Sequence, residues 1–141
     1  MADRTDLVRA FITELPYSRA LGLELDDLGP GWAVLTLPWA DALVGDPESG
    51  VIHGGAVSAR IDTACGAAAL SHPAAGASSA TLDLRIDYMR PAAARARLVA
   101  RADCHHITRS VAFVRAVAHD GDPDKPVAHA AGAFTVDGGG A

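Results

Sequence analysis

The segment GVIHGGAVSARIDTACG, residues 50–66, places a histidine, two glycines and a carboxylate in a stretch that is otherwise small and apolar. This composition predicts a buried helix from about Gly54 to Leu70. Asp62 lies in the middle of that helix, where a carboxylate is costly unless it is paired, hydrogen-bonded or neutralised. Asp62 is therefore either a structural residue that bonds to a neighbouring strand or chain, or a functional residue.

The start of this helix carries His53 followed by Gly54 and Gly55. A histidine at the junction of a loop and a helix often only caps or orients the turn. The first turn of a helix, however, leaves backbone N–H groups without partners at the positive end of the helix dipole. Glycine leaves these groups unshielded, so that they can stabilise the oxyanion that develops in acyl transfer. With Asp62 nine residues after His53, the pattern indicates acyl-transfer chemistry.

A helical wheel of about 3.6 residues per turn separates an apolar stripe, expected to lie on a sheet, from the side that carries Asp62. The neighbours of Asp62 on its side are almost all small and permit close approach by another backbone or by a ligand. Arg60 lies about 200° from Asp62, so an ion pair within the helix is not expected. The stripe is Val57, Ile61, Ala64 and Ala68, and the neighbours of Asp62 are Gly55, Ser58, Ala59, Cys65, Gly66 and Ala69.

One short helix and about six strands are predicted around the long helix. An amphipathic helix capped by Asp3 or Thr5 stops at Pro16. Two strands follow within residues 21–39, joined around the turn signal Gly-Pro-Gly, and residues 38–50 are predicted to form a polar, turn-rich loop. Four further strands are predicted over residues 81–89, 95–107, 110–119 and 127–136. The inward side chains of the first helix are Leu7, Val8, Phe11, Ile12 and Leu15.

This order of elements lacks the strand–helix alternation of a parallel α/β fold. It predicts an α+β architecture in which one antiparallel sheet wraps around a single long central helix, with a short helix at the N-terminus. The 141 residues are enough for one hydrophobic core and are predicted to form a single domain. We expect its ordered core to extend over about residues 5–136, with a frayed tail.

Composition and charge exclude several kinds of partner. The formal net charge of −5 provides no basic surface for nucleic acid or for an anionic membrane. Charged residues precede any apolar run at the N-terminus, so no signal peptide is expected. The Ala-rich stretch after residue 64 is too interrupted to span a membrane. Cys65 and Cys104 are too few for a disulfide framework, so the cytoplasm is the expected compartment.

Two motifs resemble those of a known family. The HGG at residues 53–55 and the DTA at residues 62–64 are similar, in sequence and spacing, to the helix motif of hotdog-fold acyl-CoA thioesterases of the phenylacetate-degradation (PaaI-like) type. The segment TLDLRIDYMRPA, residues 81–92, resembles the strand that follows, with its Tyr-x-Arg-Pro ending. The resemblance covers nearly the whole chain. It implies the hotdog fold, hydrolysis of an acyl- or aryl-CoA, and a homodimer with a continuous sheet, often paired as a dimer of dimers.

The resemblance also implies roles for individual residues. Asp62 matches the catalytic carboxylate, which acts as a general base on water or as a nucleophile on the thioester carbonyl. Gly54 matches the residue whose backbone N–H polarises that carbonyl. Thr81 falls where related enzymes place a hydroxyl that helps to position the water. No cofactor is implied, because coenzyme A is part of the substrate.

Four further residues are expected at the substrate. His53 and Gly55 belong to the loop and helix start beside the thioester, where His53 supports Gly54 rather than transferring protons. Glu48 is a candidate contact for substrate or water, and Arg90 for the phosphates of coenzyme A. One departure from the family is Pro47, which stands where related enzymes often have Asn or Gln.

Distance arithmetic adds a requirement for two chains. Gly54 and Asp62 are eight residues apart, which places them roughly 12 Å apart along one helix. One carbonyl cannot touch both. If they cooperate, Gly54 comes from one chain and Asp62 from another, on helices packed antiparallel across a two-fold axis, which gives two equivalent sites.

Other chemistries find less support in the sequence. No metal site is expected, because the candidate histidines lie on different strands and a loop without ligand spacing. Cys65 has no evident histidine partner, and no Gly-x-Ser-x-Gly elbow is present. Two alternatives to hydrolysis remain open, namely a dehydratase or hydratase of the same fold that acts on acyl thioesters, and a non-catalytic acyl-CoA-binding domain. The histidines in question are His72, His105, His106, His119 and His129.

Overall fold

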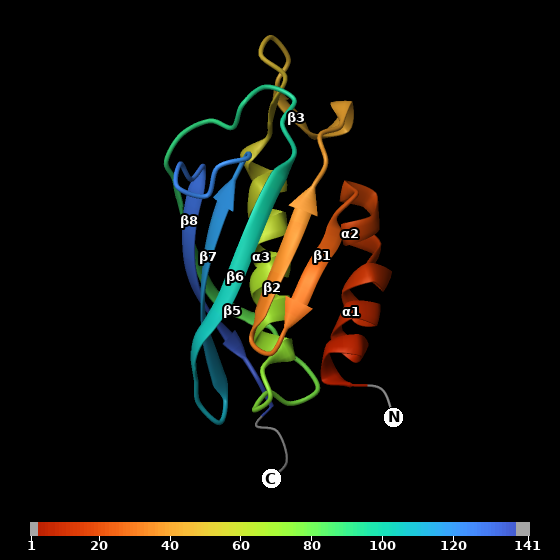
Figure 1. Cartoon of the computed structure of the whole chain (residues 1–141), viewed down its shortest axis with the longest axis vertical. Coiled ribbons are helices and arrows are strands. Elements are labelled where there is room, and N and C mark those ends of the chain that lie inside the picture. Colours follow the sequence, from red (N-terminus) through yellow and green to blue (C-terminus); the bar gives the residue numbers. More distant parts are fainter. Residues whose placement is uncertain (1–2, 138–141) are drawn as a thin grey trace.

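One antiparallel sheet curves around one long helix in the computed structural model, which describes residues 3–137 (Figure 1). Six strands lie in the order β1-β2-β6-β7-β8-β5, and each neighbouring pair is antiparallel. The helix α3 (Gly54–Ser71) lies against one face of this sheet. The predicted α+β hotdog architecture is confirmed. The six strands are β1 (Glu24–Gly29), β2 (Trp32–Leu37), β5 (Thr81–Tyr88), β6 (Leu98–Ile107), β7 (Val111–His119) and β8 (Ala128–Thr135).

Small side chains on the inner face of the sheet let α3 approach closely. The apolar stripe predicted for α3 is buried, and the helix packs mainly against β2, β6 and β7. Buried positions alternate with more exposed ones along β6 and β7, and most of the buried ones are alanine. Larger residues there would hold the helix away from the sheet, because protein interiors are close-packed. The inward alanines are Ala100, Ala102, Ala112, Ala116 and Ala118.

The helix α1 (Arg4–Glu14) turns a narrower face to the core than its sequence predicts. Val8 and Ile12 are buried as expected. Leu7 and Phe11, however, are 62% and 54% exposed, so the prediction that they face inward is wrong. The reason is that α1 lies beside α3 and β1 at the margin of the domain, where a single pair of residues one turn apart meets the core.

Pro16 has two roles, of which one was predicted. It follows the end of α1 and also begins a second helix, α2 (Pro16–Leu21), which the sequence pattern did not indicate. Proline suits the first position of a helix, because its φ is already helical and its missing N–H would have no partner there. The strand expected from residue 21 therefore begins only at Glu24.

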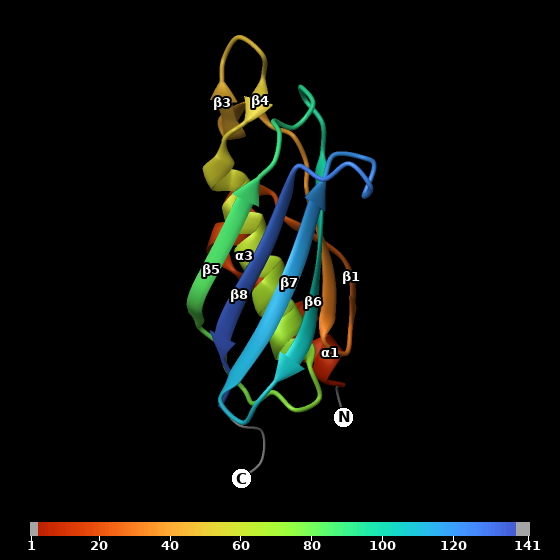
Figure 2. The ribbon, with the colours of Figure 1, turned by 90° about the vertical axis from the view of Figure 1, so that its left-hand side faces the viewer.

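The segment predicted as a loop between residues 38 and 50 contains a 3₁₀ helix (Asp41–Leu43) and a hairpin. The hairpin consists of β3 (Val44–Asp46) and β4 (Val51–Ile52) and projects beyond the N-terminal end of α3 (Figure 2). Its turn is held by Asp46, whose carboxylate accepts from the Ser49 hydroxyl at 2.7 Å. Strands of two and three residues are too short to give a period-two signal, which explains why the sequence showed only the turn.

Arg60 is buried on α3 without a partner. Its side chain is fully buried, and within residues 3–137 none of its guanidinium nitrogens has a hydrogen-bond acceptor. Burial lowers the pKa of Arg60 to about 9. The expected lack of an ion pair with Asp62 is thus confirmed. A buried charge whose desolvation is not offset by a partner destabilises the folded state.

Replacing Arg60 by leucine should therefore stabilise the protein. Apolar replacement of buried charged groups is often stabilising by about 1–4 kcal/mol, and chemical denaturation at pH 7 measures the change. The folded-state pKa of about 9 lies below the ordinary 12.5, so the unfolded state binds more protons above pH 9. The free energy of unfolding of wild type then rises with pH in that window, and the difference in stability between Arg60→Leu and wild type becomes smaller. Arg9→Leu, on the exposed side of α1, is the control, and a less stable Arg60→Leu would contradict the expectation.

Candidate active site

Asp62 is bonded to a strand that follows it in the chain. The hydroxyl of Thr81, the first residue of β5, donates to Asp62 Oδ1 at 2.8 Å. Asp62 itself is half-buried on the side of α3 away from the apolar stripe. The structure thus brings together two of the three residues for which the sequence predicts a catalytic role. The threonine oxygen keeps lone pairs that can accept a hydrogen bond from a water molecule beside the carboxylate.

A bulge in β5 turns Thr81 toward α3. Leu84 and Ile86 pack against the core, and in a regular strand Thr81 would lie on the opposite face, because alternate residues point to opposite sides. Between Thr81 and Asp83, however, the register of β5 against β8 shifts by one residue. An extra residue reverses the alternation. The hydroxyl therefore reaches Asp62, whereas period-two alternation alone would direct it away.

The hydroxyl of Thr81 should matter less for turnover than the carboxylate. A hydrogen bond to a charged group contributes about 1.5–3 kcal/mol, and bulk water replaces part of it. We expect Thr81→Val to lower kcat roughly 10-fold with a smaller rise in KM, and Thr81→Ser, which keeps the hydroxyl, to be mild. Steady-state kinetics of the two variants makes the comparison. Equal behaviour of the valine and serine variants would mean that Thr81 is only a strand residue.

The N-terminus of α3 is built around His53. The Nδ1 atom of His53 accepts a hydrogen bond from the Gly55 N–H at 2.8 Å, so this histidine caps the helix. The Gly54 N–H has no acceptor within residues 3–137. Gly45, in the hairpin, allows the loop to pass close to His53, because a Cβ at position 45 would lie 2.8 Å from the His53 Cα. The helix start thus leaves one backbone donor free, at the residue predicted to polarise the substrate carbonyl.

Tyr88 is a site residue for which the sequence predicts no role. Its hydroxyl, at the end of β5, donates to the carbonyl oxygen of Gly54 at 2.9 Å and so ties the first turn of α3 to the sheet. The side chain is nevertheless half exposed. The Tyr-x-Arg-Pro pattern contains this tyrosine, but no spacing rule links position 88 to position 54. Only the packing of β5 against α3 brings them together.

Glu48 and Arg90 lie away from Asp62 and Thr81. Glu48 is exposed at the turn of the hairpin, where its backbone N–H donates to Asp46. Arg90 forms a two-pronged pair with Asp120, with N–O distances of 2.8 and 2.9 Å, and also donates to the carbonyl oxygen of Lys125. This pairing holds the pKa of Asp120 well below its usual range. The contacts of Glu48 and Arg90 with substrate stay predictions.

Cys65 does not supply a nucleophile. Burial, aided by the negative charge of Asp62, raises the pKa of this thiol to about 12. The thiolate, which is the reactive form, is therefore absent at neutral pH. Residues 3–137 also contain no group of three His, Cys, Asp or Glu side chains arranged to hold a metal ion. Over the same residues, no helix is long and apolar enough to cross a bilayer.

A carboxylate that accepts from a threonine hydroxyl, on a helix packed against a curved sheet, with a free N–H at the start of that helix, matches the arrangement expected of hotdog-fold hydrolases. The sequence profile of the thioesterase superfamily matches residues 49–127. The chain belongs to the thioesterase superfamily and is a thioester hydrolase.

Relatives of known name or structure agree with this assignment. The medium/long-chain acyl-CoA thioesterase YigI of Salmonella typhimurium is 28% identical over 125 residues, which cover 79% of this chain and 80% of YigI. A solved Pseudomonas aeruginosa structure is 38% identical with a TM-score of 0.83, covering 94% of this chain and 98% of that one. A mutant of the phenylacetic acid degradation protein PaaI from Thermus thermophilus is 32% identical with a TM-score of 0.74, and the match covers 86% of this chain and 99% of that one.

Proposed function

We propose that this protein hydrolyses the thioester bond of an acyl- or aryl-CoA, releasing the free acid and coenzyme A. The observation that carries the proposal is the hydrogen bond from Thr81 to Asp62, which places a hydroxyl beside a half-buried carboxylate on the central helix. The similarity to YigI, which is named an acyl-CoA thioesterase, supports coenzyme A as the thiol.

The two free cysteines agree with a reducing compartment, and we propose the cytoplasm.

The reaction needs only water as second substrate. Asp62 acts as a general base: it removes a proton from a water molecule that also donates to the Thr81 hydroxyl oxygen, and the water oxygen attacks the thioester carbonyl. The Gly54 N–H stabilises the oxyanion that forms. Collapse of the tetrahedral intermediate breaks the carbon–sulfur bond, and the proton held by Asp62 passes to the departing thiolate. Direct attack by Asp62 would instead break the carbon–sulfur bond, release coenzyme A and form an anhydride, which water then opens to the free acid.

The site requires two copies of the chain. Gly54 and Asp62 both lie on α3, eight residues apart, which corresponds to about 12 Å along the helix. We propose a dimer in which the Gly54 N–H of one copy faces Asp62 of the other. The strand β5 lies at an edge of the sheet, and within residues 3–137 no strand pairs with its outer side. It carries Leu82, which is 58% exposed, and such an edge is a template for pairing with another chain.

Release of free thiol by the purified protein tests this function directly. The panel consists of acyl-CoAs with short, medium, long and aryl groups, each measured with wild type and with Asp62→Asn. Thiol release that depends on Asp62 supports hydrolysis. Tight binding of acyl-CoA without thiol release would instead favour the non-catalytic alternative, and addition or removal of water on the acyl chain would favour the hydratase.

A further inference from the structure

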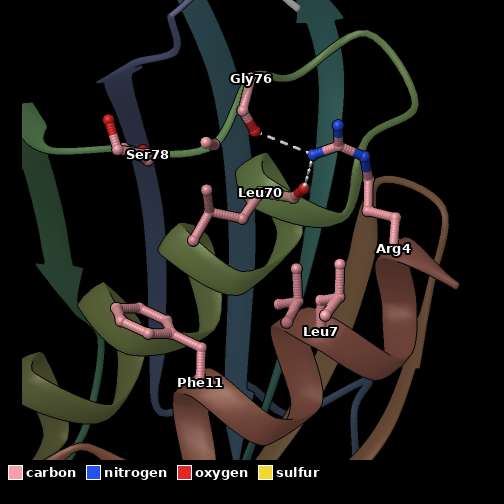
Figure 3. Close-up of a pocket in the computed structure, with 9 residues that line it drawn as sticks. Arg4, Leu7, Phe11, Leu70, Gly76 and Ser78 are labelled. Carbon is pink, nitrogen blue, oxygen red and sulfur yellow. Dashed lines mark hydrogen bonds between the residues drawn. The ribbon is translucent and has the colours of Figure 1, made fainter. Parts of the chain in front are cut away.

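An apolar cavity opens between α1 and the C-terminal end of α3. It has a volume of about 650 Å³, within the usual range for small-molecule sites. Leu7 and Phe11 of α1 form one wall, and Leu70 of α3 forms another, together with the chain from residue 76 to 79 (Figure 3). Arg4 closes one end, because its guanidinium donates to the carbonyl oxygens of Leu70 and Gly76 at 3.0 and 2.9 Å. Leu7 and Phe11, two of the exposed large apolar residues, thus line a defined pocket.

This cavity adjoins the candidate active site along two routes. The chain that lines it at residues 76–79 continues directly into Thr81, which bonds to Asp62. On α3, Asp62, Gly66 and Leu70 follow at intervals of four residues and so lie in one row along the helix. A Cβ placed on Gly66 would meet no atom within 4 Å, so the row is open between the carboxylate and the cavity. A linear group that starts at Asp62 can therefore run over Gly66 into the cavity.

We propose that this cavity binds the distal part of an aliphatic acyl chain, with Leu7 and Phe11 setting the preferred chain length. The proposal rests on the proposed thioesterase function and specifies its substrate class. Unbranched hydrocarbon fits most of the lining, because Leu7, Phe11 and Leu70 supply apolar walls and the cation Arg4 is bonded to backbone carbonyls. Ser78 and Ser79 are the hydroxyl-bearing residues of the lining, on the wall formed by residues 76–79. Burial of methylene groups against such walls is the source of affinity.

The geometry also gives a chain length. Asp62 and Leu70 are eight residues apart, or about 12 Å along α3. A fully extended chain covers roughly 1.2 Å per bond, a third of the rise of an extended residue. At this length per bond, the distance of about 12 Å corresponds to about ten bonds between the thioester carbonyl and the cavity walls beside Leu70. Acyl chains of roughly 10 to 12 carbons place their ends there, whereas an acetyl or a phenylacetyl group stops at Gly66.

Binding of S-alkyl-CoA thioethers, which cannot be hydrolysed, tests the proposal without relying on turnover. Titration calorimetry compares butyl-, octyl- and dodecyl-CoA. Each buried methylene raises affinity about four-fold, so dodecyl-CoA, with four more methylenes, should bind wild type at least about 100-fold more tightly than octyl-CoA. A chain that stays in solvent would give no such gain. An affinity that does not change beyond the butyl chain would overturn the proposal.

Two variants that change the cavity in opposite senses sharpen this test. Leu7→Trp fills it and should weaken dodecyl-CoA binding roughly 10-fold or more while butyl-CoA stays within about two-fold. Phe11→Ala widens it and should reduce the difference between octyl- and dodecyl-CoA. Arg9→Trp, on the opposite, exposed side of α1, and Tyr17→Ala, an exposed aromatic of α2, are the controls, and both should keep the wild-type dependence of affinity on chain length.

The outcomes separate this inference from the function on which it rests. A wild type that binds the thioethers with the expected length dependence but cleaves no thioester would contradict hydrolysis and keep the chain site. If wild type cleaves thioesters but Leu7→Trp shows the same dependence of affinity on chain length, the result would contradict the acyl-chain site and leave hydrolysis intact. Altered oligomeric state of Leu7→Trp in light scattering, without a change in that dependence, would assign the cavity to a second copy of the chain and overturn the proposal.

Discussion

Replacing Asp62 by asparagine is expected to lower kcat by about 10²- to 10⁴-fold, the usual contribution of a general base. Asparagine has the same shape, and its amide oxygen can still accept the hydrogen bond that Thr81 donates at 2.8 Å. The fold, the oligomeric state and KM should therefore stay close to those of wild type. What is lost is the ability to take a proton from water.

The measurement is steady-state thiol release, with circular dichroism and light scattering as checks on fold and assembly. Asp87→Asn is the matched control, because Asp87 is an exposed carboxylate of β5 whose partner is Arg85 rather than a group at the site. We expect this control to keep nearly full activity. Near-normal kcat in a well-folded Asp62→Asn protein would remove Asp62 from the chemistry and leave it as a structural partner of Thr81.

A mixture of two inactive variants should regain activity if the site is shared between chains. Gly54→Pro removes the backbone donor, and proline is tolerated at the first position of a helix. A Cβ at position 54 would meet the Tyr88 ring at 3.6 Å, an ordinary contact, so the variant should fold. Asp62→Ala removes the carboxylate. Each homodimer then lacks one half of every site, and both should be nearly inactive.

Refolding the two variants together produces mixed dimers. One site of a mixed dimer inherits both defects, and the other has an intact Gly54 from one chain and an intact Asp62 from its partner. Random pairing makes about half the dimers mixed, each with one good site of two, so activity should recover toward about a quarter of wild type per chain. Activity that stays at the parental level, with mixed dimers confirmed by mass spectrometry, would show that the two residues do not act across chains.

Several features were determined by the sequence alone, because they depend on local periodicity and residue type. The long helix, its buried stripe and the position of Asp62 away from that stripe all follow from the 3.6-residue repeat of an amphipathic helix. The absence of strand–helix alternation favoured one antiparallel sheet, and the sheet was found. His53 before two glycines indicated a helix start, which the structure places at Gly54.

Other features were decided only by tertiary structure, because they depend on partners that are distant in the chain. The bulge in β5 is a property of its pairing with β8, and it turns Thr81 from the outer face of the strand toward Asp62. Tyr88 lies at the other end of β5, and the packing of that strand against α3 brings its hydroxyl to the first turn of the helix. The position of α1 at the margin of the core leaves Leu7 and Phe11 lining a cavity, although their spacing matches that of buried residues. Periodicity states that a face is apolar, and only packing decides whether protein or a ligand covers it.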